Sequence, residues 1–181
     1  MKLLIASDIH GDIESAEKLI EIFEAEKCDK ILLLGDILYH GPRNNLPGRY
    51  APKEVIELLN KYSQKILAVR GNCDTEVDQM VLNFPILADY AILAFDGLNL
   101  YATHGHNFNE ETPPPLAEGD ILIHGHTHVI RNVKFGNKNT YLNPGSITLP
   151  KENFPRSYMI YNDREFTVYD ISGDVFERFV F

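Results

Sequence analysis

Acidic, amide and imidazole side chains stand shortly after several apolar segments of the sequence. They are Asp8, His10, Asp36, Asn72, His104, His126 and His128. Carboxylate oxygens, an amide oxygen and imidazole nitrogens are donors that divalent transition metals accept in proteins. No phosphate-binding Gly-rich loop, serine elbow or dinucleotide fingerprint accompanies them. The set therefore predicts a metal site.

The spacing of these residues predicts more than one ion. Residues i and i+2 of an extended segment point to the same side, roughly 6.5 Å apart. Asp8 and His10 are then expected to converge on one ion, and His126 and His128 to address two ions about 3.5–4 Å apart. Asp36 has two carboxylate oxygens, so it is the natural bridge between such ions.

Alternating strands and helices are expected to position these residues. Residues 2–7 read as a buried strand, and apolar residues at helical spacing predict a helix over 14–26. A second strand over 31–34, a helix over 52–62 and a third strand over 66–69 come next, which favours a parallel sheet. After Pro85 the chain reads mainly as strands, at 87–95, 98–103, 120–124, 131–135, 139–142, 157–161 and 165–171.

This order of elements predicts an α/β fold class, in one domain over residues 1–181. The second half is expected to form a sheet packed on the first, giving a four-layer α/β/β/α sandwich. Turn signals at Asp96-Gly97, Gly136-Asn137 and Asn162-Asp163 join the later strands. In an open α/β sheet, ligands bind outside the carboxyl ends of the strands. We therefore expect one site assembled from five strand ends.

Composition excludes several classes of partner. The 181 residues include 17 basic and 26 acidic side chains, a net charge of −9, which disfavours a long nucleic acid held through its phosphates. No apolar run approaches the roughly 20 residues that span a bilayer, so no membrane partner is expected. The two cysteines, Cys28 and Cys73, have no metal-finger spacing and suit a reducing compartment, so a cytoplasmic location is expected.

Five ordered blocks carry a resemblance to a known family. The blocks Asp8-Ile9-His10, Gly35-Asp36, Gly71-Asn72-Cys73-Asp74, His104 and Gly125-His126-Thr127-His128 resemble those of the calcineurin-like metallophosphoesterase superfamily. Within it, the short length, the Gly41-Pro42-Arg43-Asn44 loop and Asn143-Pro144-Gly145-Ser146 are similar to the small YfcE-type bacterial phosphodiesterases. The resemblance implies a sandwich of two packed mixed sheets.

The resemblance also implies a ligand set and a reaction. Asp8, His10, Asp36 and His128 would hold the first metal ion. Asp36, Asn72, His104 and His126 would hold the second. The donors favour Mn²⁺ first, and Fe, Co, Ni or Zn stay open. A hydroxide bridging two divalent ions would attack the phosphorus of a small phosphodiester in line.

Position 73 departs from the family pattern. Most members carry a histidine there, usually assigned to protonating the leaving group, and a thiol is a weaker proton donor. We therefore expect the enzyme to depend on acidic leaving groups, or on another donor such as His106 or a water. Asn72, Cys73 and His106 are the candidate catalytic residues. Asp74 would orient residue 73 in the family; here it is expected instead to cap a helix beginning near Thr75.

Arg43 and Asn44, in the long loop after Asp36, are candidate substrate-binding residues. The planar guanidinium of Arg43 could grip a phosphate, although a solvated loop surface is the alternative. His106 is expected beside the site or on an exposed loop, and His124 is expected to be a hydrogen-bonded core residue.

Two alternative functions stay open. A phosphomonoesterase or nucleotidase could use the same site, and cationic residues reaching the terminal phosphate oxygens would favour it. A non-catalytic protein-binding scaffold of the same fold, like the small subunit of the retromer coat, is the other. A homo-oligomer also stays open, since Phe176, Phe179 and Phe181 could lie on a sheet edge or in an interface.

Overall fold

The first half of the chain builds the centre of a six-stranded sheet. In the computed structural model, which describes residues 1–136 and 138–181, strands β1 (Leu3–Ala6), β2 (Lys30–Leu33) and β3 (Ile66–Ala68) pair in parallel. Residue Asn137, from one of the predicted turns, lies outside the described residues. The parallel pairing brings the carboxyl ends of these strands to one edge of the sheet.

The end of the chain completes this sheet with three antiparallel strands. They are β9 (Ser157–Asn162), β10 (Glu165–Asp170) and β11 (Val175–Val180), and the sheet order is β11-β10-β9-β1-β2-β3. Strand β11 was not among the predicted strands. It is an edge strand, so Phe176 and Phe179 do lie at a sheet edge, which is one of the two positions expected for them.

Three helices lie between the strands of the first half. Helix α1 (Ile13–Ala25) begins after Asp12, whose side chain accepts a hydrogen bond from the Ser15 N–H. Helix α2 (Pro52–Lys61) begins with a proline, which needs no N–H in the first turn. Helix α3 (Glu76–Val81) is a short helix after β3. No helix in 1–136 or 138–181 has both the length and the apolar character needed to cross a bilayer.

The second sheet comes from the middle of the chain. Its strands are β4 (Tyr90–Phe95), β5 (Leu98–Thr103), β6 (Ile121–Ile123), β7 (Ile130–Phe135) and β8 (Asn139–Pro144). Their order is β4-β5-β6-β8-β7, with parallel pairs β5–β6 and β6–β8 and antiparallel pairs at both edges. Both sheets are therefore mixed, as expected.

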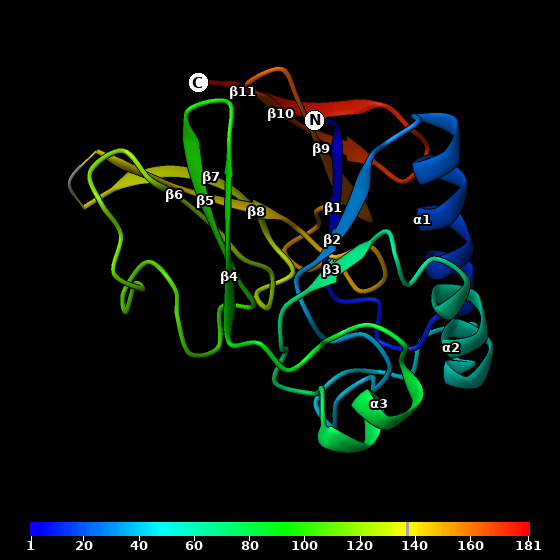
Figure 1. Cartoon of the computed structure of the whole chain (residues 1–181). Helices are drawn as coiled ribbons and strands as arrows, with labels where there is room; N and C mark the ends of the chain where they lie inside the picture. The colour runs from blue at the N-terminus through cyan, green and yellow to red at the C-terminus, as the bar shows by residue number, and fades with distance from the viewer. Residues whose placement is uncertain (137) are drawn as a thin grey trace.

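Alternation along β1 divides the core into two layers. Leu4 packs with α1 and α2, whereas Leu3 and Ile5 face the second sheet, because successive strand residues point to opposite faces. Figure 1 shows the result: α1 and α2 on one side, the six-stranded sheet in the middle and the five-stranded sheet beyond it. The expected sandwich of two packed sheets is confirmed.

The outer face of the second sheet differs from the expected fourth layer. In the described residues, the segment 104–119 contains no helix. It includes Pro113, Pro114 and Pro115, which remove backbone donors that a helix needs. Tyr101 of β5 donates a hydrogen bond to the Pro115 carbonyl at 3.4 Å, so this loop is tied to the sheet.

Candidate metal centre

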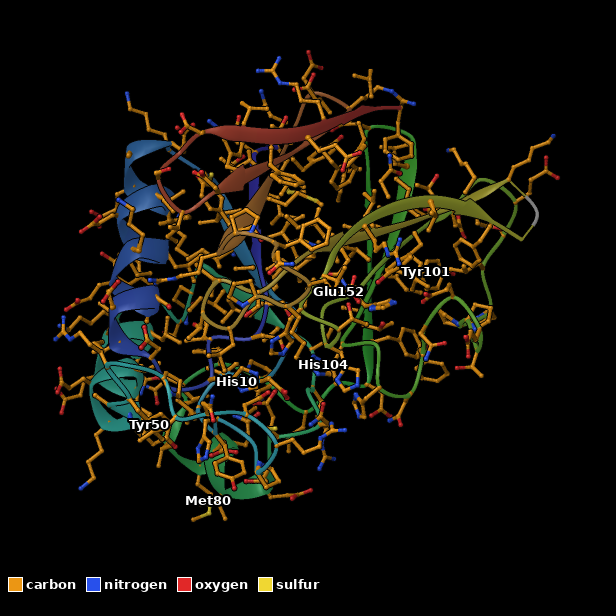
Figure 2. All side chains as sticks on the ribbon, turned by 180° about the vertical axis from the view of Figure 1, so that it is seen from behind. His10, Tyr50, Met80, Tyr101, His104 and Glu152 are labelled. Carbon is orange, nitrogen blue, oxygen red and sulfur yellow. The ribbon has the colours of Figure 1, made fainter. Side chains whose placement is uncertain are left out.

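All seven predicted ligands come together where five strands end. Asp8 and His10 follow β1, Asp36 follows β2, and Asn72 follows β3. In the second sheet, His104 follows β5, and the turn with His126 and His128 connects β6 to β7. Figure 2 shows His10 and His104, from the two different sheets, pointing into the same region. The interface of the two sheets thus places the cluster at one end of the sandwich.

One part of the cluster is formed by Asp8, His10 and His128. The Asp8 Oδ1 lies 3.2 Å from His128 Nε2 and 3.5 Å from His10 Nε2. The two Nε2 atoms are 3.4 Å apart. All three side chains are buried. Burial by itself raises the pKa of Asp8, but His10 and His128, when their Nε2 atoms are protonated and donate to it, outweigh burial, and the pKa lies well below its usual range.

The other part is centred on His104. Its Nε2 lies 3.1 Å from Asn72 Oδ1 and 3.1 Å from His126 Nδ1. The same nitrogen is 3.6 Å from Asp36 Oδ2, which is also 3.8 Å from His10 Nε2. One carboxylate oxygen of Asp36 thus stands between the two parts, which is the position that a bridging ligand needs.

Backbone carbonyls orient three of the imidazoles. The Nδ1 atoms of His10, His104 and His128 lie 2.8, 2.6 and 2.5 Å from the carbonyl oxygens of Tyr39, Leu34 and Leu149. A carbonyl only accepts, so each Nδ1 carries the proton and a neutral ring leaves its Nε2 lone pair facing the cluster. Histidines that bind metals are held by outer contacts of this kind.

The donor set fits a cation. The Asp8 Oδ1 is buried and accepts no hydrogen bond from the described residues. The lone pairs of His10 and His128 face each other at 3.4 Å, a contact that two neutral rings cannot make as a hydrogen bond when both Nδ1 atoms are protonated. A metal ion satisfies all three atoms at once. Metal-type groupings within 4.8 Å also include Asp8 with Asp36 and His104.

The backbone reaches this arrangement in a way that the spacing argument did not anticipate. That argument took Asp8 to His10 and His126 to His128 as extended, and this is wrong. Five of the seven residues have left-handed φ, namely Asp8 at 61°, His10 at 52°, Asp36 at 54°, His126 at 65° and His128 at 62°. Backbone hydrogen bonds hold these turns, among them His10 N–H to the Asp36 carbonyl at 2.9 Å. The side chains converge because the loops turn sharply beyond the strand ends.

Asp74 holds the loop that carries Asp36. Its carboxylate accepts hydrogen bonds from the N–H groups of Asp36 at 2.9 Å, Ile37 at 2.9 Å and Gly71 at 2.7 Å. Burial raises the pKa of Asp74 to about 6, although the backbone donors act in the other direction. The expectation that Asp74 caps the next helix is wrong. Thr75 caps α3 instead, because its hydroxyl and the Asp78 carboxylate form a capping box.

Cys73 lies against the cluster but is not activated. Its Sγ is within 4.8 Å of donor atoms of His10 and Asp36. Its N–H donates to Asp36 Oδ1 at 2.8 Å, and Asn72 Nδ2 donates to its Sγ at 3.2 Å. Burial, and after it the charge of Asp36, raise the pKa of the thiol. A thiol in this setting is a weak proton donor and nucleophile at neutral pH.

His106 lies beside the cluster, next to His104 and His126. Its ring centroid is 5.3 Å from that of His104, and its Nδ1 is buried without a hydrogen-bond partner in the described residues. It lines a side cavity with Glu110 and His124, away from Cys73. His124 is a hydrogen-bonded core residue, stacked on Tyr141 at 4.2 Å, as expected.

A cavity of about 320 Å³ opens onto the cluster at Asp36 and His126. Arg43 and Asn44, the candidate substrate-binding residues, line it. Asn44 is fixed by a hydrogen bond from its Nδ2 to the His40 carbonyl at 2.8 Å. Lys151 also lines this cavity and was not anticipated. A single lysine in the segment after β8 gives no sequence signal, since only the fold brings it beside His128.

Comparisons with known proteins agree with this geometry. The family model described as "Calcineurin-like phosphoesterase superfamily domain" matches residues 1–165. Phosphodiesterase YfcE of Escherichia coli K12 is 46% identical over 164 residues, which are 90% of this chain and 89% of that protein. A solved structure of E. coli YfcE superposes with a TM-score of 0.96 at 41% identity, covering 99% of both chains. Vacuolar protein sorting 29 of Cryptosporidium parvum shares the fold, at a TM-score of 0.63 and 19% identity, over 99% of this chain and 97% of that one.

Proposed function

This chain belongs to the calcineurin-like phosphoesterase superfamily, and from that premise we propose that it is a phosphodiesterase acting on small substrates with two divalent metal ions. It is a metal-dependent phosphoesterase by family. The proposal for a diester rests on the 46% identity to a phosphodiesterase over 90% of the chain. The observation that carries the metal chemistry is the unpartnered Asp8 Oδ1 among imidazole lone pairs.

The two parts of the cluster would each hold one ion. Asp8, His10, Asp36 and His128 would bind the first, and Asp36, Asn72, His104 and His126 the second. When bound, such ions lower the pKa of water from 15.7 towards about 7 and neutralise charge on phosphoryl oxygens. Mn²⁺ is the preferred candidate for this mixture of oxygen and nitrogen donors.

The chain's own residues supply orientation and charge. Asp74 fixes the backbone of Asp36 through two N–H groups, so the bridging carboxylate keeps its place. Asn72 holds its Oδ1 at 3.1 Å from His104, while its Nδ2 donates to Cys73 Sγ and has a second N–H that would serve a phosphate oxygen. Arg43 and Lys151 bring positive charge to the cavity wall.

A phosphomonoesterase remains the second candidate, for one structural reason. Arg43 and Lys151 line the cavity that opens onto the cluster, and a monoester carries one more negative charge than a diester for them to neutralise. A protein-binding scaffold has less support, because a scaffold does not need the complete donor set that this chain retains. Two free, buried cysteines suit the cytoplasm, which we propose as the location.

Hydrolysis assays with controlled metal content test the proposal. The protein is stripped with a chelator, reloaded with Mn²⁺, and assayed on bis-(4-nitrophenyl) phosphate and on 4-nitrophenyl phosphate. We expect activity only after reloading, with a preference for the diester. Asp36→Asn should lose more than the roughly 10- to 100-fold that loss of an outer contact costs a metal site.

Asp120→Asn is a matched control. Asp120 is also a buried aspartate, but it lies before β6, at the opposite end of that strand from His126, where it accepts a hydrogen bond from Asn99 Nδ2 at 3.0 Å. We expect this variant to keep its rate. Equal rates before and after chelation would refute the metal-dependent mechanism, and a preference for the monoester would favour the second candidate.

A further inference from the structure

A second cavity, of about 380 Å³, lies on the far side of Cys73 from the main one. Its walls come from the loop after β2, from α2 and from α3. The residues that make it apolar are Leu38, Tyr39, Tyr50, Ile56, Val77 and Val81. Lys53 and Asp78 also line it, whereas the neighbouring cavity at the metal centre is lined mainly by polar and charged residues, among them Asp36, Arg43 and Lys151.

One side chain belongs to the walls of both this apolar cavity and the cavity at the metal centre. Cys73 lines both cavities. Gly41, which lines the cavity at the metal centre, packs against this thiol, since an added Cβ at Gly41 would lie 3.1 Å from the Cys73 Sγ. The two cavities therefore adjoin at the Cys73 thiol.

The aromatic wall is fixed relative to the metal centre. The carbonyl of Tyr39 accepts the hydrogen bond that orients His10, so the backbone that carries the Tyr39 ring is tied to that ligand. The Tyr50 ring packs on the backbone of Gly11, where an added Cβ would lie 2.5 Å from a ring carbon. His40 stands edge-on between the two tyrosine rings, with centroid distances of 4.8 and 5.3 Å.

We propose that this cavity is the subsite for a flat aromatic ester group of the phosphodiester. The inference rests on the proposed function and names its substrate class. Aromatic rings pack favourably against tyrosine rings and aliphatic side chains, and the volume is within the range of small-ligand pockets. The charge of Asp78 at the rim is already engaged by the Thr75 N–H and hydroxyl, at 2.8 and 2.9 Å, so a neutral ring meets no unpaired acid there.

Variants of the wall test the subsite. Ile56→Trp fills the cavity from α2, and Val77→Glu places a charge in it from α3. Both residues line the cavity, whereas Met80, also on α3 and 82% exposed, does not. Figure 2 shows Met80 at the lower edge of the molecule, pointing outwards. Met80→Glu is therefore the matched control for Val77→Glu.

The assay compares an aryl diester, bis-(4-nitrophenyl) phosphate, with a dialkyl diester, glycerophosphoethanolamine, in Mn²⁺-loaded protein. We expect Ile56→Trp and Val77→Glu to raise KM for the aryl diester about tenfold, the scale of one lost apolar contact in a pocket. The KM for the dialkyl diester should stay within about twofold, and Met80→Glu should change neither. Thermal melts show whether each variant is folded. Because Val77 is 69% exposed, its substitution is compatible with folding, and Val77→Glu tests the subsite if Ile56→Trp unfolds.

The outcomes separate the two proposals. An equal rise in KM for both diesters, or no rise for either, overturns the subsite and leaves the phosphodiesterase intact. Wild-type protein that hydrolyses neither diester overturns the proposed function and the subsite with it. Binding of monophenyl phenylphosphonate, a diester analogue, gives a readout without turnover: calorimetry should show weaker binding to Val77→Glu and unchanged binding to Met80→Glu.

Discussion

Left-handed backbone is concentrated at the candidate ligands. Asp8, His10, Asp36, His126 and His128 all have positive φ, which costs an L-residue about 1–2 kcal/mol. Such strain persists where the surrounding structure imposes it, and it gathers at functional sites. Here hydrogen bonds between the loops hold these conformations, among them the bond from the His10 N–H to the Asp36 carbonyl. Their turns point the side chains at a common centre, so the strain serves the site.

Cys73→His tests the role of position 73. Burial and Asp36 raise the pKa of the Cys73 thiol, so the wild-type residue is a weak donor to a leaving alkoxide. An imidazole there should raise turnover on alkyl diesters by up to about 100-fold, the lower end of general-acid contributions. Diesters with a 4-nitrophenolate leaving group should gain less, because that group needs no proton. Steady-state rates on the two substrate classes are the measurement.

Cys28→Ser is the control for this exchange. Cys28 is the other buried free thiol, and it packs with the α1 side of the core, away from the cluster. Its variant should leave both rates unchanged. If Cys73→His fails to improve turnover on alkyl diesters while remaining folded, the thiol is not what limits those substrates.

His124 gives the protein a defined sensitivity to acid. Its pKa is lowered by burial, against the opposing effects of Glu110, 3.0 Å away, and the Gly125 carbonyl. Tyr141 stacks on the ring, and His104 is a further nearby cation when protonated. Because the pKa of His124 is lower in the folded chain, the His124 ring takes up a proton more readily in the unfolded chain below pH 6.5. The stabilising contribution is complete above pH 6.5 and is lost as the pH falls towards the lowered folded-state value.

Urea unfolding of the chelated protein at pH 7.5 and pH 5.5 measures this effect. We expect the wild type to lose more free energy of unfolding over this interval than His124→Gln, which has no titrating ring. A pH dependence that is identical in the two proteins would assign the acid sensitivity to other groups, of which His106 and His126 have pKa values shifted in the same direction.

At the level of elements, the loop after β3 packs directly on the loop after β2. An added Cβ at Gly71 would lie 2.1 Å from Asp36 Oδ1 and 2.3 Å from its backbone nitrogen. Gly71→Ala should therefore displace the bridging carboxylate, lower the free energy of unfolding by about 1–3 kcal/mol, and weaken Mn²⁺ binding. Gly48→Ala is the control, because nothing lies within 4 Å of its added Cβ. Denaturant titration measures the free energy of unfolding of both variants, and calorimetric titration measures their Mn²⁺ affinity. Equal values for Gly71→Ala and Gly48→Ala would contradict the packing argument.

The same elements show what the sequence could and could not predict. Helix α1 was expected over 14–26 and lies at Ile13–Ala25, because its apolar spacing and the Asp12 cap are local signals. Strand β11 was missed, because five of its six residues are exposed, as an edge strand allows, and Glu177 and Arg178 interrupt its four apolar residues. The residue types of the ligands could be recognised in the sequence. The left-handed turns that carry them could not, since these turns depend on hydrogen bonds between loops far apart in sequence.

Lys151 and the aromatic cavity are two further features that the sequence alone could not predict. Lys151 reaches the site because its N–H bonds to the His128 carbonyl at 3.1 Å, a contact between segments that share no motif. Tyr39 and Tyr50 belong to a loop that reads as irregular. Its approach to the site depends on the absence of a side chain at Gly11 and Gly41. Such positions become informative only when the neighbouring backbone is known.

At the scale of the whole molecule, the net charge of the chain and the charge of the metal-loaded centre would have opposite signs. The chain carries a net charge of −9, yet two divalent ions would add +4 beside the −2 of Asp8 and Asp36. The metal centre would then attract a phosphodiester while the rest of the surface repels polyanions. This distribution favours small substrates over long nucleic acids.

Metal binding should also stabilise the entire fold. The ligands come from five strand ends in two sheets, so the complete donor set exists only in the folded chain, and ions bound there shift the unfolding equilibrium. At a free Mn²⁺ concentration about 100 times the dissociation constant, the gain is about 2.7 kcal/mol per site. For a chain of this length that corresponds to a rise in Tm of about 5–10 °C over the chelated protein. Scanning calorimetry should show this rise in the wild type and in Asp120→Asn, and a much smaller rise in Asp36→Asn, which weakens both parts of the cluster. A Tm that does not respond to Mn²⁺ while activity does would contradict this coupling between metal binding and the stability of the fold.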